Sequence, residues 1–176
     1  MKTIIILSLL LSMLAGCAGS PRGIQVVRNF DINRYLGKWY EIARLDHSFE
    51  RGLSNVSALY TSRDDGGIDV LNKGYDKSRG SWKQAKGRAY FVKDKTVGKL
   101  KVSFFRPFYG GYNIIDLDHE NYSHAMVCGP DRSYFWILAR DRMLDRPLLD
   151  KLLEKAKNFG FEVDKLIFVE QDRPDA

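Results

Sequence analysis

The sequence predicts an all-β fold: an eight-stranded antiparallel up-and-down barrel, with one C-terminal α-helix packed outside it and a short last strand. Eight segments rich in β-branched and aromatic residues follow one another with short connections. Glycine-rich turns separate several of them, and a single helical pattern comes only after the eighth. Eight evenly spaced strands in meander order are the number that closes a small barrel.

The first sixteen residues have the features of a signal peptide. Lys2 gives a positive start, and the apolar run from Ile4 to Leu14 is too short to span a bilayer comfortably. The run ends in Leu14-Ala15-Gly16-Cys17, which resembles the lipobox of bacterial lipoproteins. That resemblance implies that Cys17 receives diacylglycerol and begins the mature chain. The alternative is an ordinary secretory signal that is cleaved nearby and releases an unanchored protein.

The lipobox resemblance divides the chain into three parts. Residues 1–16 are the signal peptide, residues 17–28 the lipidated N-terminus and a tether, and residues 29–176 the folded domain. Ala18 follows the cysteine, as in lipoproteins that are sorted to the outer membrane, and this resemblance argues against retention in the inner membrane. Because two or more acyl chains anchor a protein stably, we expect a domain that is held at the periplasmic face of the outer membrane.

The strands and the helix are expected in the following order. The Asp64-Asp65-Gly66-Gly67 sequence indicates a hairpin turn. Asp145 is expected to cap the helix, Pro147 fits its first turn, and Gly160 ends it. The eight strands are expected at residues 37–45, 55–63, 68–75, 83–92, 99–105, 111–117, 122–127 and 133–140, and the last short strand at 166–169.

Two of the strands say where the helix packs. The segments 39–43 and 134–139 carry apolar side chains on both faces. A strand that is apolar on both faces is covered on both sides. One side is the barrel lumen, so the other must be covered by the helix or by a partner subunit. The helix supplies an apolar stripe at helical spacing for this contact, formed by Leu148, Leu149, Leu152, Leu153 and Ala156.

Composition and motifs argue against several function classes. The chain has 176 residues and a net charge of +6, without the arginine-rich stripe or aromatic signature of nucleic-acid binding. It lacks the sequence motifs of serine hydrolases, zinc proteases and thiol oxidoreductases, so we expect no enzyme, no cofactor and no metal site. His47, His119 and His124 are interpreted as solvated or incidental. Cys128 is interpreted as a buried packing residue, because Cys17 leaves it without a disulfide partner.

Two motifs identify a family resemblance. Gly37-Lys38-Trp39 resembles the Gly-x-Trp motif that precedes the first strand of lipocalins, and Arg140 stands where that family places an arginine across the tryptophan. The resemblance implies that Gly37, Trp39 and Arg140 close one end of the barrel. Within that family, the sequence is most similar to the bacterial subgroup and its plant and animal relatives. The segments that carry this similarity are GKWYEIARLDHSFERG (37–52), NVSALY (55–60), KVSFFRPFYGGYNIIDLD (101–118) and CGPDRSYFWILAR (128–140).

The subgroup resemblance also implies a ligand and a role. It implies binding of fatty acids or lysophospholipids in the lumen, for lipid storage or transport in membrane maintenance under stress, and it makes a homodimer reasonable. Two alternatives remain open. A haem or pigment binder would need His124 inside the lumen, and a structural envelope protein would have a filled barrel.

The pocket residues follow from alternation along the strands. With Trp39 inside, Glu41 and Ala43 share its face, and Tyr134, Trp136 and Leu138 share the face of Arg140. For Glu41 two roles are open: a polar contact to the ligand, or a bond to a nearby tyrosine or basic residue. Weaker alternation arguments add Tyr60, Tyr90, Phe104, Tyr112 and Met126 to the expected lining.

Overall fold

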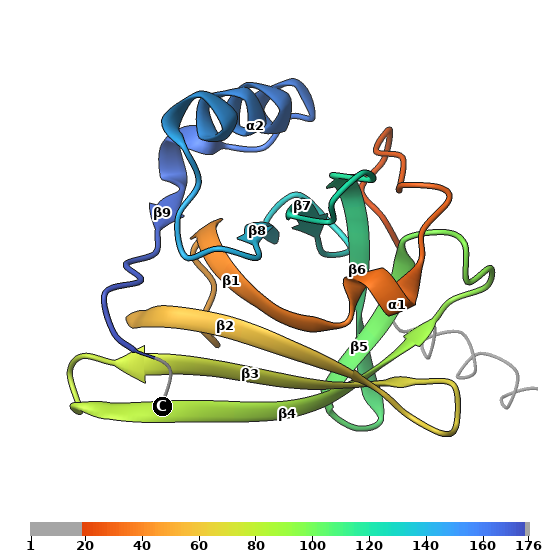
Figure 1. Cartoon of the computed structure of the whole chain (residues 1–176), viewed down its shortest axis with the longest axis horizontal. Helices are drawn as coiled ribbons and strands as arrows, with labels where there is room; N and C mark the ends of the chain where they lie inside the picture. Colours follow the sequence, from red (N-terminus) through yellow and green to blue (C-terminus); the bar gives the residue numbers. More distant parts are fainter. Residues whose placement is uncertain (1–18, 175–176) are drawn as a thin grey trace, which may run out of the picture.

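In a computed structural model, which describes residues 19–174, eight antiparallel strands curl into a closed barrel (Figure 1). From β1 to β8 each strand pairs with the next one in sequence. The pairing of β8 with β1 closes the barrel. The signal peptide and Cys17 lie outside the described residues. The strands are β1 (Gly37–Arg44), β2 (Leu53–Ser62), β3 (Ile68–Asp76), β4 (Ser81–Phe91), β5 (Lys99–Phe105), β6 (Phe108–Leu117), β7 (His124–Cys128) and β8 (Phe135–Ala139).

The predicted all-β barrel is therefore confirmed, with strand ends that differ by up to three residues from those expected. Two short elements were not predicted: α1 (Ile32–Tyr35) and the 3-10 turn η1 (Val163–Lys165). Asp31 caps α1, because its side chain accepts a hydrogen bond from the Asn33 amide at 2.9 Å. Elements this short contain no full hydrophobic period, so their sequence pattern does not reveal them.

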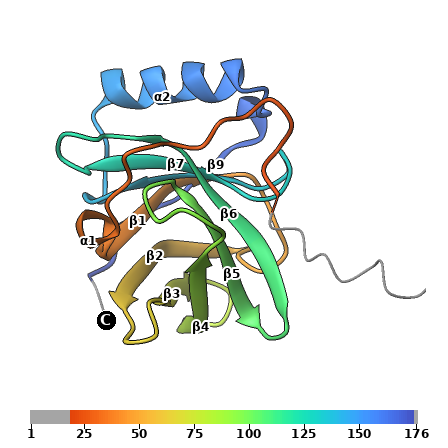
Figure 2. The ribbon, with the colours of Figure 1, turned by 90° about the vertical axis from the view of Figure 1, so that its right-hand side faces the viewer.

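The helix α2 (Arg146–Asn158) packs outside the barrel, as predicted (Figure 2). Asp145 caps it by accepting a hydrogen bond from the Leu148 amide at 2.9 Å, and Gly160 follows it with a φ of +82°. Leu152 and Ala156 lie on the inner face of α2 and are buried against one side of the barrel. The outer face of that wall is therefore covered by the helix.

The barrel wall under α2 separates two apolar cores. In β7, Ala125 and Val127 belong to the core inside the barrel, whereas Met126 and Cys128 belong to the core between barrel and helix. Alternation along a strand sends neighbouring side chains to opposite faces. Both faces of β7 and β8 are apolar for this reason.

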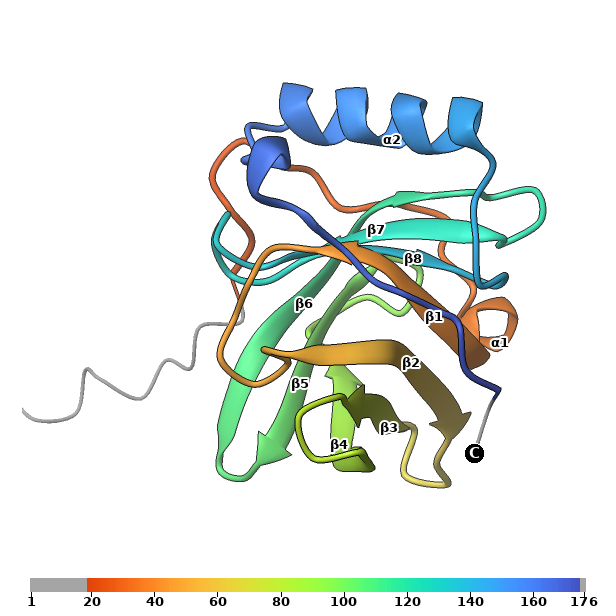
Figure 3. The same ribbon diagram turned by 90° about the vertical axis from the view of Figure 1, so that its left-hand side faces the viewer.

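The C-terminal segment lies along β1 (Figure 3). The short strand β9 (Ile167–Phe168) pairs with β1 beyond the point where β1 stops pairing with β2. Further on, the Gln171 side-chain amide donates to the carbonyl oxygens of Glu41, at 2.9 Å, and Val56, at 2.8 Å. The tail thus bridges β1 and β2 where their own ladder ends.

Part of the expected tether also packs against the barrel. Ile24 is buried, the Val27 amide donates to the Ile114 carbonyl at 2.9 Å, and Asn113 donates to the Gly19 carbonyl at 2.9 Å. Among residues 19–174, no helix is both long and apolar enough to cross a membrane.

Candidate functional site

A cavity of about 430 Å³ occupies the barrel lumen. All strands except the short β9 contribute side chains to its wall, which is mainly aliphatic and aromatic. An apolar wall of this kind suits a hydrophobic ligand, because burying such surface is favourable without directional contacts. The aliphatic lining consists of Ile32, Val56, Ala58, Ile68, Val70, Ala89, Leu100, Val102, Val127 and Leu138.

Three tyrosine hydroxyls form a polar point at the closed end of the cavity. The Tyr112 hydroxyl lies 2.8 Å from that of Tyr35 and 2.9 Å from that of Tyr60. Burial raises the pKa of all three phenols, so the hydroxyls stay protonated. Two hydrogen bonds join the three hydroxyls and use two of their three hydrogen atoms. The third hydrogen atom can be donated to another acceptor.

Below these tyrosines, Arg140 closes the barrel over Trp39. The guanidinium carbon lies 4.0 Å from the indole centroid. Its nitrogens donate to the carbonyl oxygens of Arg34, Leu36, Lys38 and Tyr122. Gly37 makes this approach possible, because it has a φ of +94° and a Cβ there would lie 3.3 Å from an Arg140 nitrogen. The expected closing role of Gly37, Trp39 and Arg140 agrees with these contacts.

The other end of the cavity opens to solvent between phenylalanine side chains. Phe105 and Phe108 line the cavity and are also 77% and 69% exposed, and Phe49 is 58% exposed. Phe49 comes from the β1–β2 loop, whereas Phe105 and Phe108 flank the β5–β6 turn and stack in parallel. Side chains that belong both to the cavity and to the surface mark its mouth.

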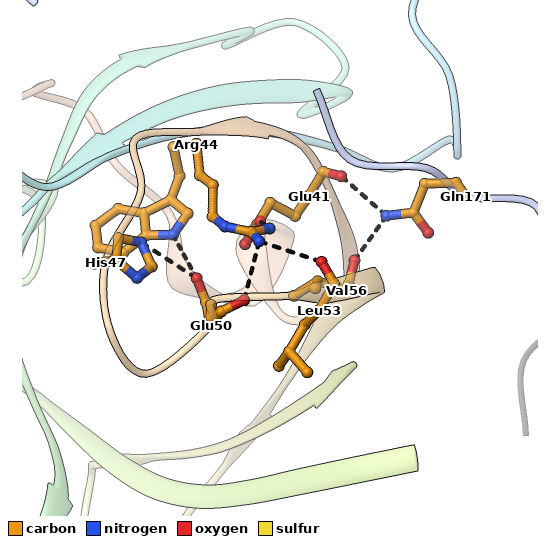
Figure 4. Close-up of polar contacts among 8 residues, drawn as sticks. Glu41, Arg44, His47, Glu50, Leu53, Val56 and Gln171 are labelled. Carbon is orange, nitrogen blue, oxygen red and sulfur yellow. Dashed lines mark hydrogen bonds and ion pairs between the residues drawn. The ribbon is translucent and has the colours of Figure 1, made fainter. Parts of the chain in front are cut away.

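A buried charged cluster lies in the wall near this mouth (Figure 4). Glu41 and Arg44, both on β1, form an ion pair of 2.6 Å and are 3% and 1% exposed. Arg44 also donates to the carbonyl oxygens of Glu50, at 3.0 Å, and Leu53, at 3.2 Å. It thereby ties the β1–β2 loop to the barrel wall. Burial, and next the charge of Glu50, raise the pKa of Glu41 well above its ordinary value.

Glu50 joins this cluster to a group of rings. Its Oε2 accepts a hydrogen bond from the Trp136 indole at 3.1 Å and lies 3.3 Å from Nε2 of His47. The His47 contact has the distance of an ion pair but not hydrogen-bond geometry, so the imidazole nitrogens stay unpaired. Burial raises the pKa of Glu50. Burial, and next the charge of Arg44, lower the pKa of His47 to about 4, so this histidine is neutral at pH 7.

Most of the expected lining residues do line the cavity. Alternation placed the inward side chains correctly on β2, β5, β6 and β8, and on the first half of β1. Trp39 itself does not line the cavity. Its ring packs against that of Tyr35 at the closed end, with 4.6 Å between the ring centroids. The residues of the expected set that line the cavity are Glu41, Tyr60, Phe104, Tyr112, Tyr134, Trp136 and Leu138.

Three of the expected lining residues face away from the lumen. A bulge in β1 between Glu41 and Ala43 shifts its register against β8, so Ala43 turns outward to the helix and Arg44 turns inward. Met126 packs under α2, because Val127 is the inward residue of β7. Tyr90 is on the outer side of β4, where its hydroxyl donates to Asp65 at 3.2 Å.

The histidines need two corrections. His47 is not solvated: it is 6% exposed and its ring stacks on Phe49 with centroids 4.1 Å apart. His124 shares the outward face of β7 with Met126, and no histidine lines the cavity among the described residues. The haem alternative required His124 in the lumen, so it loses its axial ligand. Among residues 19–174, no cluster of acidic, histidine or cysteine residues could hold a metal ion.

Cys128 has the packing role expected of it. The side chain is fully buried under α2 and forms no disulfide within residues 19–174. Burial raises the pKa of its thiol to about 12, so the reactive thiolate is not formed near neutral pH.

Sequence reasoning missed Tyr35, Arg44, Phe49 and Glu50. Alternation placed Arg44 outside, and the bulge that turns it inward has no sequence signal of its own here. Phe49 and Glu50 belong to a loop, to which alternation does not apply. A useful signal was available in Phe49-Glu50-Arg51, since an apolar ring beside charges in a loop next to a barrel mouth suggests a lining role.

Comparisons with known proteins agree with this architecture. Residues 30–171 match the model of the lipocalin-like domain family. The chain is 55% identical to the outer membrane lipoprotein Blc of Vibrio cholerae serotype O1, over 90% of this chain and 93% of that protein. It is 58% identical to the protein of the same name from Escherichia coli K12, over 86% and 85%. The crystal structure of the cockroach allergen Per a 4 superposes with a TM-score of 0.67, at 22% identity, covering 86% of this chain and 94% of that one.

The family model spans most of the described barrel, and the two bacterial relatives are similar over nearly the whole chain. The fold, the stacked Trp39 and Arg140 pair and the apolar lumen agree with that match. The chain therefore belongs to the lipocalin family, and within it to the bacterial outer-membrane lipoproteins.

Proposed function

We propose that this protein holds one single-chain lipid, a fatty acid or a lysophospholipid, in the lumen of its barrel. In this proposal it stores or carries such lipids for maintenance of the membrane under stress. The observation that supports it best is the apolar cavity of about 430 Å³ with its mouth at one end. Membership of a family of binding proteins supports a carrier rather than an enzyme.

The cavity suits an acyl chain on energetic grounds. Each buried methylene group contributes about 0.8 kcal/mol, so a chain with ten buried methylenes gains about 8 kcal/mol before the cost of association. The wall between mouth and floor offers the chain aliphatic and aromatic contacts. A polar headgroup then stays near the mouth, where solvent and the Glu41–Arg44–Glu50 cluster are within reach.

The anchor proposed for this protein is the lipidated Cys17. The two bacterial relatives carry the name outer membrane lipoprotein, and Cys17 ends a segment that resembles a lipobox. A tether would keep the barrel close to the bilayer whose lipids it takes up.

We further propose a homodimer, because the edge strand β9 leaves Ile167 and Phe168 exposed. Light scattering on the purified protein tests this, and a monomer mass would contradict it.

The ligand is tested by native mass spectrometry and solvent extraction on the full chain, purified from its cells in a non-ionic detergent. We expect one single-chain lipid per barrel. A matched pair of variants locates it: Ala89→Trp fills the lumen from β4, whereas Lys86→Trp adds the same ring to the outer face of the same strand. The proposal predicts loss of lipid only from the first. A barrel free of lipid in the unsubstituted protein, or equal retention in both variants, contradicts it.

A further inference from the structure

The charged cluster at the mouth contains more acid than base. Glu41 and Glu50 present two carboxyl groups to this end of the cavity, and both line it. Arg44 is the guanidinium buried with them, and it pairs with the Glu41 carboxylate at 2.6 Å. The neighbouring His47 is uncharged at pH 7, because its pKa is about 4. With both carboxyls ionised, the cluster would therefore carry one uncompensated negative charge.

An uncompensated charge at this depth is costly, because the two glutamates are 3% and 6% exposed. Burial raises the pKa of both carboxyl groups, which favours a protonated form of the cluster over this charge. A bound cation would replace that proton as the counter-charge.

Aromatic faces line the cavity beside the same carboxylates. Phe49, Tyr134 and Trp136 border this end of the lumen, and their ring centroids lie 6.3 to 6.4 Å from one another. His47 packs behind them, 4.1 Å from Phe49 and 4.9 Å from Trp136 between centroids, and does not line the cavity. Trp136 is further fixed by its hydrogen bond to Glu50. Rings held in this way attract an ammonium group, most strongly when water is excluded.

From this juxtaposition we infer that the mouth is a headgroup site for an ammonium ion, formed by Glu41, Glu50 and the faces of Phe49, Tyr134 and Trp136. The inference rests on the proposed lipid-carrier function and selects among its ligands. Single-chain phospholipids with an ethanolamine or choline headgroup carry such an ion, and their acyl chain would continue into the apolar lumen. Their phosphate lies only two carbons from the nitrogen, so it stays at the solvent-open mouth.

The same arrangement disfavours two other ligands. A fatty acid would bring a carboxylate toward Glu41 and Glu50 and be repelled by them. A lysophospholipid with a glycerol headgroup has the phosphate but no cation to balance the surplus charge. Both can still insert their chains, so the expected result is a preference rather than exclusion. Reversed insertion, with the fatty-acid carboxylate at the tyrosine hydroxyls, is the arrangement left to that ligand.

The headgroup site is tested by competition between two lipids, with native mass spectrometry as the measurement. The full chain in non-ionic detergent receives equal amounts of lysophosphatidylethanolamine and lysophosphatidylglycerol with the same acyl chain, and native mass spectrometry reports which one is bound. We expect a preference of about tenfold or more for the ethanolamine lipid, which corresponds to about 1.4 kcal/mol. Glu50→Gln removes the surplus charge and keeps the side-chain shape, so its preference should fall close to one.

Two further variants keep the result interpretable. Glu162→Gln removes an exposed carboxylate near the outer helix and should keep the full preference. Phe49→Leu keeps an apolar side chain at a 58% exposed position without a ring face, and should reduce the preference about threefold even if Glu50→Gln fails to fold. Calorimetry in buffers of different ionisation enthalpy should show proton release on binding the ethanolamine lipid and none on binding the glycerol lipid.

The outcomes separate the two levels of the account. If the unsubstituted protein binds both lipids equally, or prefers the glycerol lipid, the headgroup site is wrong and the lipid carrier stands. A preference that survives both Glu50→Gln and Phe49→Leu also overturns the site. If neither lysophospholipid nor a fatty acid of the same chain length binds, the carrier function falls and the headgroup site falls with it.

Discussion

The guanidinium of Arg140 lies over the indole of Trp39, 4.0 Å from its centroid, and donates to four backbone carbonyls, three within residues 34–38 and one at Tyr122. Arg140→Ala should lower the free energy of unfolding by about 3 kcal/mol, because four carbonyls lose a charged donor and the Trp39 indole loses its stacked guanidinium. Arg140→Lys should recover little of this, since an ammonium group cannot span those carbonyls. Urea unfolding measures both variants against Arg79→Ala, whose side chain is exposed. Equal stability of Arg140→Ala and this control would contradict the closing role.

The buried ion pair makes a prediction that depends on pH. In Arg44→Met, Glu41 and Glu50 lose their guanidinium and their pKa values rise further. A carboxyl group with a raised pKa in the folded state stabilises the fold below its unfolded pKa, and that contribution is lost as pH rises through the folded pKa. The deficit of Arg44→Met should therefore be small near pH 4.5 and about 3 kcal/mol or more near pH 7.5.

An exposed ion pair provides the control for that variant. Arg51 pairs with Asp46 at 2.9 Å, and its side chain is 65% exposed. Arg51→Met should cost less than about 1 kcal/mol, with little change between the two pH values. Chemical denaturation at both pH values distinguishes the cases. A deficit of Arg44→Met that shrinks as pH rises would contradict the assignment of two acids to one base.

His47 gives the opposite dependence. Its pKa is about 4 in the folded protein and about 6.5 when unfolded, so its neutral form stabilises the fold above pH 6.5. That contribution is lost as pH falls from about 6.5 to about 4. The groups that act on it are Arg44 and Arg51, which lower its pKa, and Asp46, which raises it, while Glu50 lies 3.3 Å away.

The variant His47→Phe keeps the stacking and removes the titration. Between pH 7 and pH 4 the unsubstituted protein should lose up to about 2 kcal/mol relative to this variant, after allowance for screening by solvent at the mouth. His119→Phe, at an exposed closed-end position, should follow the unsubstituted protein. Thermal unfolding across this range reports the difference, and parallel curves for all three proteins would refute the prediction.

The exposed rings at the mouth predict a kinetic effect. Phe105 and Phe108 are 77% and 69% exposed beside the opening, where an acyl chain would pass between bilayer and lumen. Replacing both with Ser should slow the uptake of a fluorescent lysophospholipid from vesicles severalfold, with the final occupancy nearly unchanged. Met143→Ser is the matched control, because Met143 is 79% exposed but follows β8 at the closed end. Equal rates for both variants would show that the mouth rings do not assist entry.

Much of this fold could be read from the sequence because its signals are local. The turn at Asp64-Asp65-Gly66-Gly67, the Asp145 cap and the Gly160 stop each act through neighbouring backbone, and all three stand where they were expected. The packing of α2 also followed from strands that are apolar on both faces. These features need no knowledge of distant partners.

The site was less predictable, because it depends on register. Glu41 and Trp136 were correctly placed in the lumen, but one bulge after Glu41 reversed the orientation of Ala43 and Arg44. On β7 both faces are apolar, so the pattern could not decide between Met126 and Val127. The cluster around Glu50 joins a loop to β1 and β8, and such a contact across the chain leaves no periodic signal.

The role left open for Glu41 is partly answered by its geometry. Its carboxylate pairs with Arg44, a basic neighbour, while the same side chain lines the cavity. The structural bond is therefore present, and the ligand contact is what the headgroup competition examines.

The central claim is that the barrel lumen holds the acyl chain of a single-chain lipid. Photocrosslinking tests it most directly, with a lysophospholipid that carries a diazirine near the end of its chain. After irradiation, peptide mass spectrometry should find adducts on inward residues such as Val70, Ala89 and Leu100. Adducts confined to the outer face of α2 or to β9, or no saturable adduct at all, would contradict the claim.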